Sequence, residues 1–383
     1  MLDALYQKSI EKKEEINSFF QDITQDINVE KVKDEYEKCE FNKTKQDKSF
    51  AAIDGSFNKT KFMAGYVYAI TSQTIISKPN NDVQKESQAV DISTISTIHN
   101  NKIDRILSLQ MNIFELKSTI DTLKKHPDIN YMLMDGPISG TLTNYRQPEI
   151  PKEMNKILTS ISHEYFTPEL EKDDMTLDII TERKRELFET ICKDYIRGNN
   201  LDINYDDVEM DVIMCLEGYE QLFCISYLLK HFKEKIICIS KTSSTKSLFN
   251  ENIPDIAVLE YTCDKAGYTH LRGYDSMRPF RLVGSVARQV DFPVKNLELS
   301  NTPYYTCFAK LEDKSQVLKI EIPRKIEEKE LESILNNLES ISVHGYPHIL
   351  KKAHDEVKIG NEFIKRITRD VNLVNREDRS VLN

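Results

Sequence analysis

Glycine is scarce in this chain, which contains only 11 glycines in 383 residues. Neither Gly-x-x-x-x-Gly-Lys-Ser/Thr nor Gly-x-Gly-x-x-Gly occurs, so a nucleotide fold built on a glycine-rich phosphate loop is disfavoured. Long apolar runs are also missing. No stretch approaches the roughly 20 residues of a membrane helix, and we expect no membrane contact.

The seven cysteines form no recognisable pattern. Their number is odd and none lies in Cys-x-x-Cys, which argues against structural zinc and a disulfide framework. The first residues carry an acid, Asp3, and no basic region before an apolar core, so they do not read as a signal peptide. Together these features predict a reducing, cytoplasmic location.

Positive charge is not in excess, because the net charge is −10. This argues against a protein that coats nucleic acid through bulk charge. It leaves room for an enzyme whose basic groups are confined to one groove, since the local field matters more than the total.

Two short apolar runs end in Asp-Gly. Phe50–Ile53 leads into Asp54-Gly55, and Tyr131–Met134 leads into Asp135-Gly136. Each run is typical of a buried strand, and an unpaired carboxylate at its end is costly to bury. A bound Mg²⁺ or Mn²⁺ would offset that cost. Asp-Gly is also an ordinary turn dipeptide, so either motif alone is weak evidence.

The order of predicted elements brings the two motifs together. We expect three antiparallel strands within residues 49–78, at Phe50–Asp54, Lys61–Thr71 and Gln73–Lys78, and a short one at Val90–Ile95. Apolar residues spaced three and four apart predict a helix at Ile103–Lys125, followed by a strand at Asn130–Asp135. A right-handed crossover would place that strand beside the first, with Asp54 next to Asp135.

The remainder reads as an α/β chain with a helical insertion at about 140–210 and a fifth strand at Lys235–Ser240. We expect amphipathic helices within residues 1–40. After the insertion we expect mixed structure at Asp206–Leu216 and a helix at Tyr219–Phe232. The last third should contain strands at Val283–Arg288, Tyr304–Leu311 and Val317–Ile322 and helices at Glu327–Leu338 and Pro347–Thr368. We divide the chain into an N-terminal helical segment (1–45), a main domain (46–369) and a polar tail (370–383).

Phosphoryl chemistry with two metal ions needs several carboxylates around the cations. Glu115, on the flank of the apolar face of its helix, is the third candidate beside Asp54 and Asp135. The alternative is a solvated surface glutamate. His354 shares a helix face with apolar residues and should point inward, either as a core histidine or as a metal ligand or proton donor.

Two segments could bind a phosphate or DNA. Lys241 follows the fifth strand in a hydroxyl-rich turn that suits a phosphate, although an ordinary polar loop is equally plausible. The predicted hairpin of Tyr304–Leu311 and Val317–Ile322 interleaves aromatic and basic residues, as proteins that bind single-stranded nucleic acid do. The alternative is that the rings belong to the core. Its candidates for DNA contact are Tyr304, Tyr305, Lys310 and Lys319, with Phe308 and Arg324 nearby.

These segments resemble the NurA nucleases of archaea and bacteria. Ala51-Ala52-Ile53-Asp54-Gly55-Ser56 and the Asp135-Gly136 strand resemble the first two family motifs, and Ser240-Lys241-Thr242 matches a family lysine. The sequence from Val343 to His354, with Gly-Tyr-Pro and Ala-His, resembles the closing motif.

The resemblance implies an RNase H-like mixed sheet, with three antiparallel strands followed by parallel strands and crossover helices. It implies a homodimeric nuclease dependent on Mn²⁺ or Mg²⁺, which trims DNA ends 5′ to 3′ and cuts single strands. The implied partner in double-strand break repair is a hexameric HerA-type translocase. By position, Asp54, Asp135 and His354 would lie in the active site; the match at Glu115 is looser.

Two other functions fit the same pattern. An actin- or sugar-kinase-type ATPase also places Asp-Gly turns at phosphates, although it usually needs a glycine-rich adenosine site. A non-catalytic adaptor could use the same fold to dock on a DNA motor. ATP hydrolysis would favour the first, and partner binding without cleavage would favour the second.

Overall fold

A ten-stranded mixed sheet forms the centre of the computed structural model, which describes residues 2–25, 27–41, 46–79, 82–99, 101–274, 294, 297, 299, 302–371 and 373. The strand order is β1-β7-β9-β10-β6-β5-β2-β3-β4, with β8 also paired to β9. The strands are β1 (Tyr36–Lys38), β2 (Phe50–Lys61), β3 (Gly65–Ser77), β4 (Val83–Ser96), β5 (Tyr131–Asp135), β6 (Ile236–Ser240), β7 (Gly267–Thr269), β8 (Arg272–Tyr274), β9 (Tyr304–Lys310) and β10 (Leu318–Ile322). A separate hairpin pairs β11 (Ser342–Val343) with β12 (Tyr346–Pro347).

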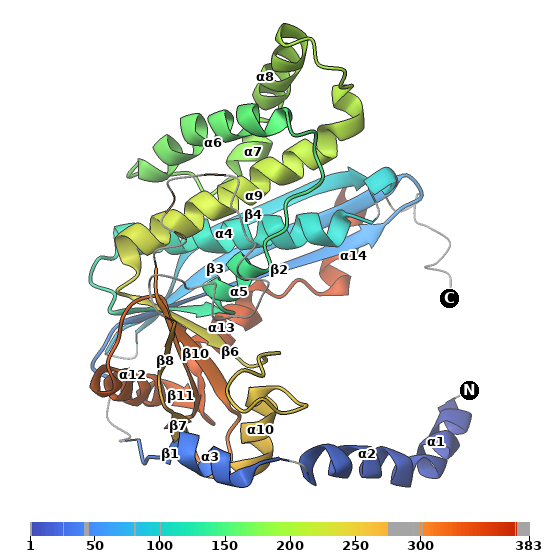
Figure 1. Cartoon of the computed structure of the whole chain (residues 1–383). Coiled ribbons are helices and arrows are strands. Elements are labelled where there is room, and N and C mark those ends of the chain that lie inside the picture. The colour runs from blue at the N-terminus through green and yellow to red at the C-terminus, as the bar shows by residue number, and fades with distance from the viewer. Residues whose placement is uncertain are drawn as a thin grey trace.

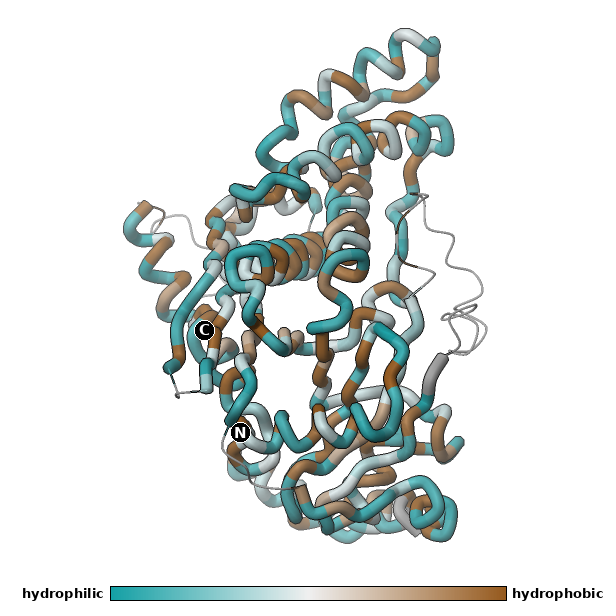
Figure 2. Tube along the Cα trace, turned by 90° about the vertical axis from the view of Figure 1, so that its left-hand side faces the viewer, coloured by the Kyte–Doolittle hydropathy of each residue, from teal (hydrophilic) through white to brown (hydrophobic). Residues whose placement is uncertain are grey.

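Helices cover both faces of this sheet (Figure 1). The helices are α1 (Leu2–Glu11), α2 (Lys13–Gln25), α3 (Val29–Glu35), α4 (Ile103–Lys125), α5 (Ile138–Thr143), α6 (Met154–Glu171), α7 (Ile180–Arg183), α8 (Arg185–Gly198), α9 (Tyr205–Phe232), α10 (Asp255–Thr262), α12 (Glu328–Ser340), α13 (His348–Val357) and α14 (Asn361–Asp370), with a short 3₁₀ turn at Thr97–His99. Figure 2 shows hydrophobic and hydrophilic residues alternating along most of the helices.

Side chains of β2 alternate between two cores. Ala51 and Ile53 pack in the core formed with α4, α6 and α9, whereas Phe50 and Ala52 pack in the core formed with α12 and α13. Successive residues of a strand point to opposite faces, so a central strand covered on both sides is a continuous apolar run. Asp54 follows Ala52 in this alternation and faces the α13 side.

The predicted central topology is confirmed. β2 pairs in parallel with β5, and β5 pairs in parallel with β6, after the crossover helices α4 and α9. α4 spans the predicted residues, and β9 and β10 form the predicted antiparallel pair. The result is the RNase H-like sheet that the resemblance implied. The predicted strand at Val283–Arg288 lies outside the described residues.

The first three strands are longer than predicted. β2 continues through Asp54-Gly55 to Lys61, so this dipeptide lies within a strand and is not a turn. The predicted second and third strands form one strand, β3, and the third partner is the polar strand β4. The predicted short strand at Val90–Ile95 is the second half of β4; the first half was missed because an edge strand needs few apolar side chains.

Two helices also differ from the prediction. The region 206–216 is helical and continuous with the following helix, giving the 28-residue α9. By length and hydropathy α9 could cross a membrane, but 94% of its apolar window is buried inside the fold, as in a core helix. The predicted last helix divides into α13 and α14 at residues 358–360.

The first two helices lie apart from the cores, whereas α3 buries Val32 against α10. Helices were predicted here, and α1, α2 and α3 confirm them, but α1 has no buried residue. In Figure 1, α1 and α2 extend away from the body of the molecule. Their apolar side chains are exposed, so this part of the chain does not pack on its own core: Leu2, Leu5, Tyr6, Ile10, Ile16, Phe19 and Phe20.

A buried ion pair joins the two crossover helices. Lys117 Nζ on α4 lies 2.7 Å from Glu220 Oε1 on α9, and both side chains are almost fully buried. The Glu220 carboxylate also accepts hydrogen bonds from the backbone N–H groups of Ile180 and Thr181. This pair therefore fixes α7 and the helical insertion to the central helices.

Replacing Lys117 by methionine should reduce the free energy of unfolding by about 3–5 kcal/mol, because the substitution leaves a buried carboxylate without its cation. Lys8→Met provides the control, since Lys8 and Glu11 form an exposed pair and such pairs contribute less than about 1 kcal/mol. Urea unfolding followed by circular dichroism measures both. Equal effects of the two substitutions would contradict the role assigned to the buried pair.

Candidate active site

Two carboxylates meet where β2 and β5 run side by side. The parallel register pairs Ile53 with Met134, so Asp54 and Asp135 are the next residues on neighbouring strands. Asp54 alternates with Ala52 along β2, and Asp135 alternates with Leu133 along β5. Both carboxylates therefore lie on the same face of the sheet, the one covered by α13. The structure thus brings together the two acids that the sequence pointed to.

Asp54 is held by two hydrogen-bonding partners. Its Oδ1 accepts a hydrogen bond from the backbone N–H of Gly55 at 2.9 Å, and its Oδ2 lies 2.8 Å from Nδ1 of His354 on α13. The Asp54 side chain is 12% exposed and that of His354 is 55% exposed. The prediction that His354 points inward is therefore wrong: its ring lies at the surface, where only one edge contacts the carboxylate.

Glu115 reaches the same place from the opposite face of the sheet. A Cβ atom at Gly55 would lie 2.6 Å from Glu115 Oε1, so the missing side chain leaves the space that this carboxylate occupies. Glu115 is partly buried. Burial, with the charges of Asp54 and Asp135 as smaller causes, raises its pKa from 4.5 to about 8.

Asp135, Lys241 and Tyr346 form the second half of the site. Burial among neighbouring atoms and the charge of Asp54 raise the pKa of Asp135, whereas Lys241 and His354 oppose this shift. The ammonium of Lys241 lies 4.2 Å from the centre of the Tyr346 ring, a cation–π contact. Burial, and then the charges of Asp135 and Asp54, raise the pKa of the Tyr346 hydroxyl.

Tyr346 was not among the predicted site residues. It is the first residue after a tight turn, His344-Gly345, in which both residues have positive φ (53° and 72°), as a two-residue hairpin requires. A Cβ at Gly345 would collide with Ser315. The Gly-Tyr-Pro motif was visible in the sequence; its hairpin geometry, which directs the ring toward the acids, was not.

Two of the four predicted DNA contacts on the β9–β10 hairpin are buried. Tyr304 is 1% exposed and Lys310 is 2% exposed, so neither is available to a strand of DNA. Lys310 pairs with Glu260 at 3.3 Å. Alternate residues of β9 point into the cores, and Tyr305 is partly buried against the α12–α13 side. Phe308 and Arg324 are buried as well, and Lys319 remains accessible in part.

The donor set suits a hard divalent cation. Asp54, Glu115 and Asp135 supply oxygen atoms and His354 an imidazole, and the charges of Asp54 and Asp135 add to burial in raising the pKa of Glu115. Among the described residues, no group of three or more such side chains is gathered in a form that could hold a metal as it stands. The carboxylates would have to turn toward one another to share a cation.

Comparison with known proteins matches residues 48–359 to the family model described as the NurA domain. A curated relative, the probable DNA double-strand break repair nuclease NurA of Methanocaldococcus jannaschii, is 28% identical over 97% of this chain and 88% of its own length. The crystal structure of the NurA nuclease from Sulfolobus solfataricus has a TM-score of 0.69 at 23% identity, covering 97% of each chain. A crystal structure of NurA bound to dAMP and manganese has a TM-score of 0.66 at 16% identity, covering 92% of this chain and 94% of that one.

In the presence of EDTA, Glu115→Gln should raise the free energy of unfolding above that of the unchanged protein. This gain should be larger at pH 8 than at pH 5 by on the order of a few kcal/mol. Between pH 4.5 and about 8 the unfolded chain has released the proton that folded Glu115 keeps. Folding stability therefore falls as pH rises through this interval, and glutamine removes that fall. Urea unfolding of both proteins at each pH measures it. A difference between them that is the same at both pH values would contradict the shift.

Proposed function

The chain belongs to the NurA family, and we propose that it is a metal-dependent DNA nuclease that hydrolyses phosphodiester bonds in the repair of double-strand breaks. The observation that carries this proposal is the convergence of Asp54, Glu115 and Asp135 with His354 at one point of the sheet. We further propose 5′ to 3′ trimming of DNA ends and cutting of single strands as its activities, in line with the family resemblance.

Asp54, Glu115, Asp135 and His354 would hold the cation, for which manganese is the first candidate and magnesium the second. A structural relative that contains manganese together with a nucleotide supports this assignment. The cation supplies charge stabilisation at the scissile phosphate and acidifies the attacking water. The absent side chain at Gly55 leaves Glu115 free to approach from the α4 side.

The remaining residues have distinct roles in this proposal. Lys241 places a positive charge beside the acids and stabilises negative charge that develops on the phosphate. Tyr346 orients Lys241 through the cation–π contact. His354, more than half exposed and hydrogen-bonded to Asp54, is placed to pass a proton between the site and solvent.

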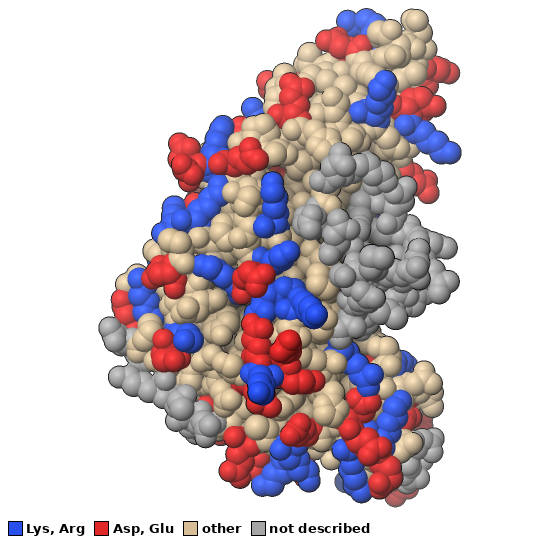
Figure 3. All heavy atoms as spheres, turned by 60° about the vertical axis from the view of Figure 1, so that its left-hand side comes forward, with Lys and Arg blue, Asp and Glu red and all other residues tan. Residues whose placement is uncertain are grey.

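Local charge, and not the net charge, would guide DNA to this site. Figure 3 shows Lys and Arg interspersed with Asp and Glu on the face in view, without a continuous basic surface. With a net charge of −10, the chain gains little from general attraction to phosphates. DNA binding should therefore depend on a few groups near the acids, such as Lys241.

Asp54→Ala should fold normally and lose DNA cleavage in Mn²⁺ by several orders of magnitude, because the carboxylate that pairs with His354 and faces Asp135 is gone. Asp202→Ala, in an exposed loop of the helical insertion, is the matched control and should cleave like the unchanged protein. End-labelled single- and double-stranded DNA, with and without Mn²⁺, gives the readout. Cleavage retained by Asp54→Ala would rule out this site.

We assign the N-terminal segment 1–45 to contacts with a protein partner, the nuclease domain to 46–369 and a polar tail to 370–383. The match to the NurA domain falls within the assigned nuclease domain. The exposed apolar side chains of α1 and α2 lack a core of their own, as expected for a docking surface. The proposed partner is a hexameric HerA-type ATPase that feeds DNA to a homodimer of this chain, in the cytoplasm.

Replacing Leu5 and Phe19 together by glutamate should abolish complex formation with the HerA-type ATPase while leaving unassisted cleavage unchanged. These side chains are 64% and 60% exposed on α1 and α2, so the charges do not disturb a core. Size-exclusion chromatography with light scattering measures both the complex and the free protein. Full complex formation by the variant would refute this contact, and loss of the homodimer would assign the helices to self-association.

A further inference from the structure

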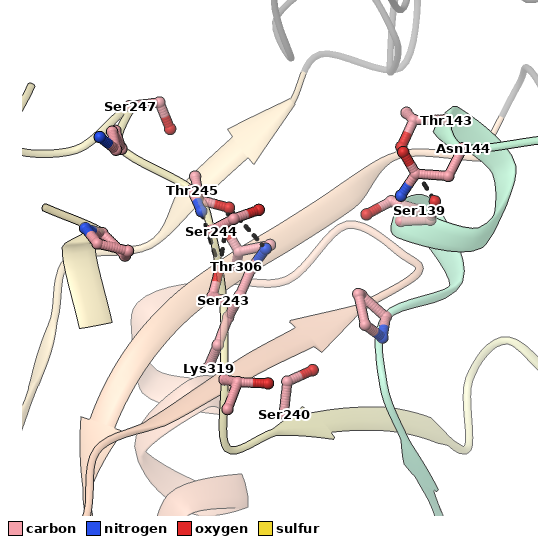
Figure 4. A pocket seen from close by; sticks show the side chains of 15 residues that line it. Ser139, Thr143, Asn144, Ser240, Ser243, Ser244, Thr245, Ser247, Thr306 and Lys319 are labelled. Atoms are coloured by element: carbon pink, nitrogen blue, oxygen red, sulfur yellow. Dashed lines mark hydrogen bonds between the residues drawn. The ribbon is translucent and has the colours of Figure 1, made fainter. Parts of the chain in front are cut away.

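A polar pocket of about 880 Å³ lies beside the candidate active site. This volume is within the range of roughly 300–1,000 Å³ typical of ligand pockets. Figure 4 shows two facing walls: Ser139 and Thr143 on α5 with Asn144 just after it, and the segment after β6 with Ser243, Ser244 and Thr245. Ser240, Thr306 and Lys319 line it between these walls.

The pocket adjoins the acids along the chain, at the carboxyl ends of β5 and β6. Its lining begins at Pro137, two residues after Asp135, and includes Ser240 and Thr242, the neighbours of Lys241 in the sequence. A chain-like ligand bound at Asp54 and Asp135 would meet this pocket by passing over the carboxyl ends of β5 and β6. The strand residues of the pocket, Ser240, Thr306 and Lys319, alternate with residues of the α12–α13 core, so they lie on the opposite face of the sheet from Asp54 and Asp135.

The lining has the chemistry of an anion site. Nine of its described residues carry a hydroxyl group, two are lysines and none is acidic, in a protein with a net charge of −10. Lys319 Nζ lies 3.3 Å from Thr245 Oγ1 and makes no ion pair among the described residues. Hydroxyl groups and a lysine without an acidic partner are the groups that bind phosphate oxygens.

The walls are fixed before any ligand arrives. The buried carboxylate of Glu321 on β10 accepts hydrogen bonds from the backbone N–H (2.9 Å) and the hydroxyl of Ser139, which anchors the start of α5 to the sheet. On the other wall, Ser243 Oγ donates to Thr245 Oγ1 at 3.0 Å. A site held in place in this way loses little conformational entropy when it binds.

Aromatic side chains are absent from the described lining. Proteins that hold single strands by their bases use aromatic rings for stacking, and this pocket offers none. We infer that it binds the sugar–phosphate backbone of a DNA strand next to the bond being cut, through phosphate oxygens and without reading the sequence. This inference rests on the proposed nuclease function and adds a second contact for the substrate.

Lys319→Gln tests the inference through binding alone, by fluorescence anisotropy of labelled single-stranded DNA in EDTA, where no cleavage takes place. Affinity should fall about tenfold, the value of one charge-assisted hydrogen bond. The slope of binding against salt concentration should fall by about 1. Lys319→Arg keeps the charge and should bind normally, and Lys329→Gln, exposed on α12, is the matched control.

Three DNA strands identify the phosphate that is bound. If Lys319→Gln binds both the 5′-hydroxyl and the 5′-phosphate strand more weakly, the pocket holds an internal phosphate. If it binds only the 5′-phosphate strand more weakly, the pocket holds a terminal phosphate. Both results support the pocket. An abasic strand of the same length should show the same loss. If only strands with bases are affected, or if Lys319→Arg is as defective as Lys319→Gln, the inference is overturned.

A second variant guards against a folding defect at Lys319, which is partly buried. Ser244→Asp introduces a negative charge at an exposed residue of the lining and should also weaken binding severalfold by repulsion. Normal binding by both variants, in a protein that cleaves DNA in Mn²⁺, would reject the pocket and leave the nuclease intact. Binding that depends on Lys319 in a protein that cleaves nothing would reject the nuclease and retain the pocket.

Discussion

Repulsion between carboxylates is the constraint on which this site depends. The parallel pairing of β2 with β5 places Asp54 beside Asp135, and α4 adds Glu115 across Gly55. Such an arrangement of like charges is unfavourable unless protons or cations neutralise it. The fold tolerates it because two large cores on either side of the sheet hold the strands in place. The site is therefore a local loss of stability that the surrounding structure compensates.

The site is assembled from both faces of one sheet. His354 and Tyr346 approach from the side of α13, and Glu115 approaches from the side of α4. This is possible only where a strand has a residue without a side chain, and Gly55 provides that gap. The glycine after Asp54 thus has a role other than the turn expected from the dipeptide: it lets a helix on the opposite face contribute an acid.

Much of the core could be predicted from the sequence because local patterns determine it. The apolar spacing of α4 and the continuous apolar runs of β5 and β6 follow from burial alone. Only the Val90–Ile95 part of the edge strand β4 was predicted, because the polar composition of the remainder reflects solvent on its outer side. The burial of Tyr304 and Lys310 was equally hidden, since an alternating strand looks the same whether its rings face a core or a ligand.

The ion pair between Lys117 and Glu220 has a consequence for behaviour on heating. Hydration of charged groups becomes less favourable as temperature rises, so the cost of keeping this pair away from water declines. The link between α4 and α9 should then hold while hydrophobic packing elsewhere gains no further strength. Since Glu115 lies on the same helix as Lys117, the arrangement of the candidate active site would persist up to the temperature at which the whole domain unfolds.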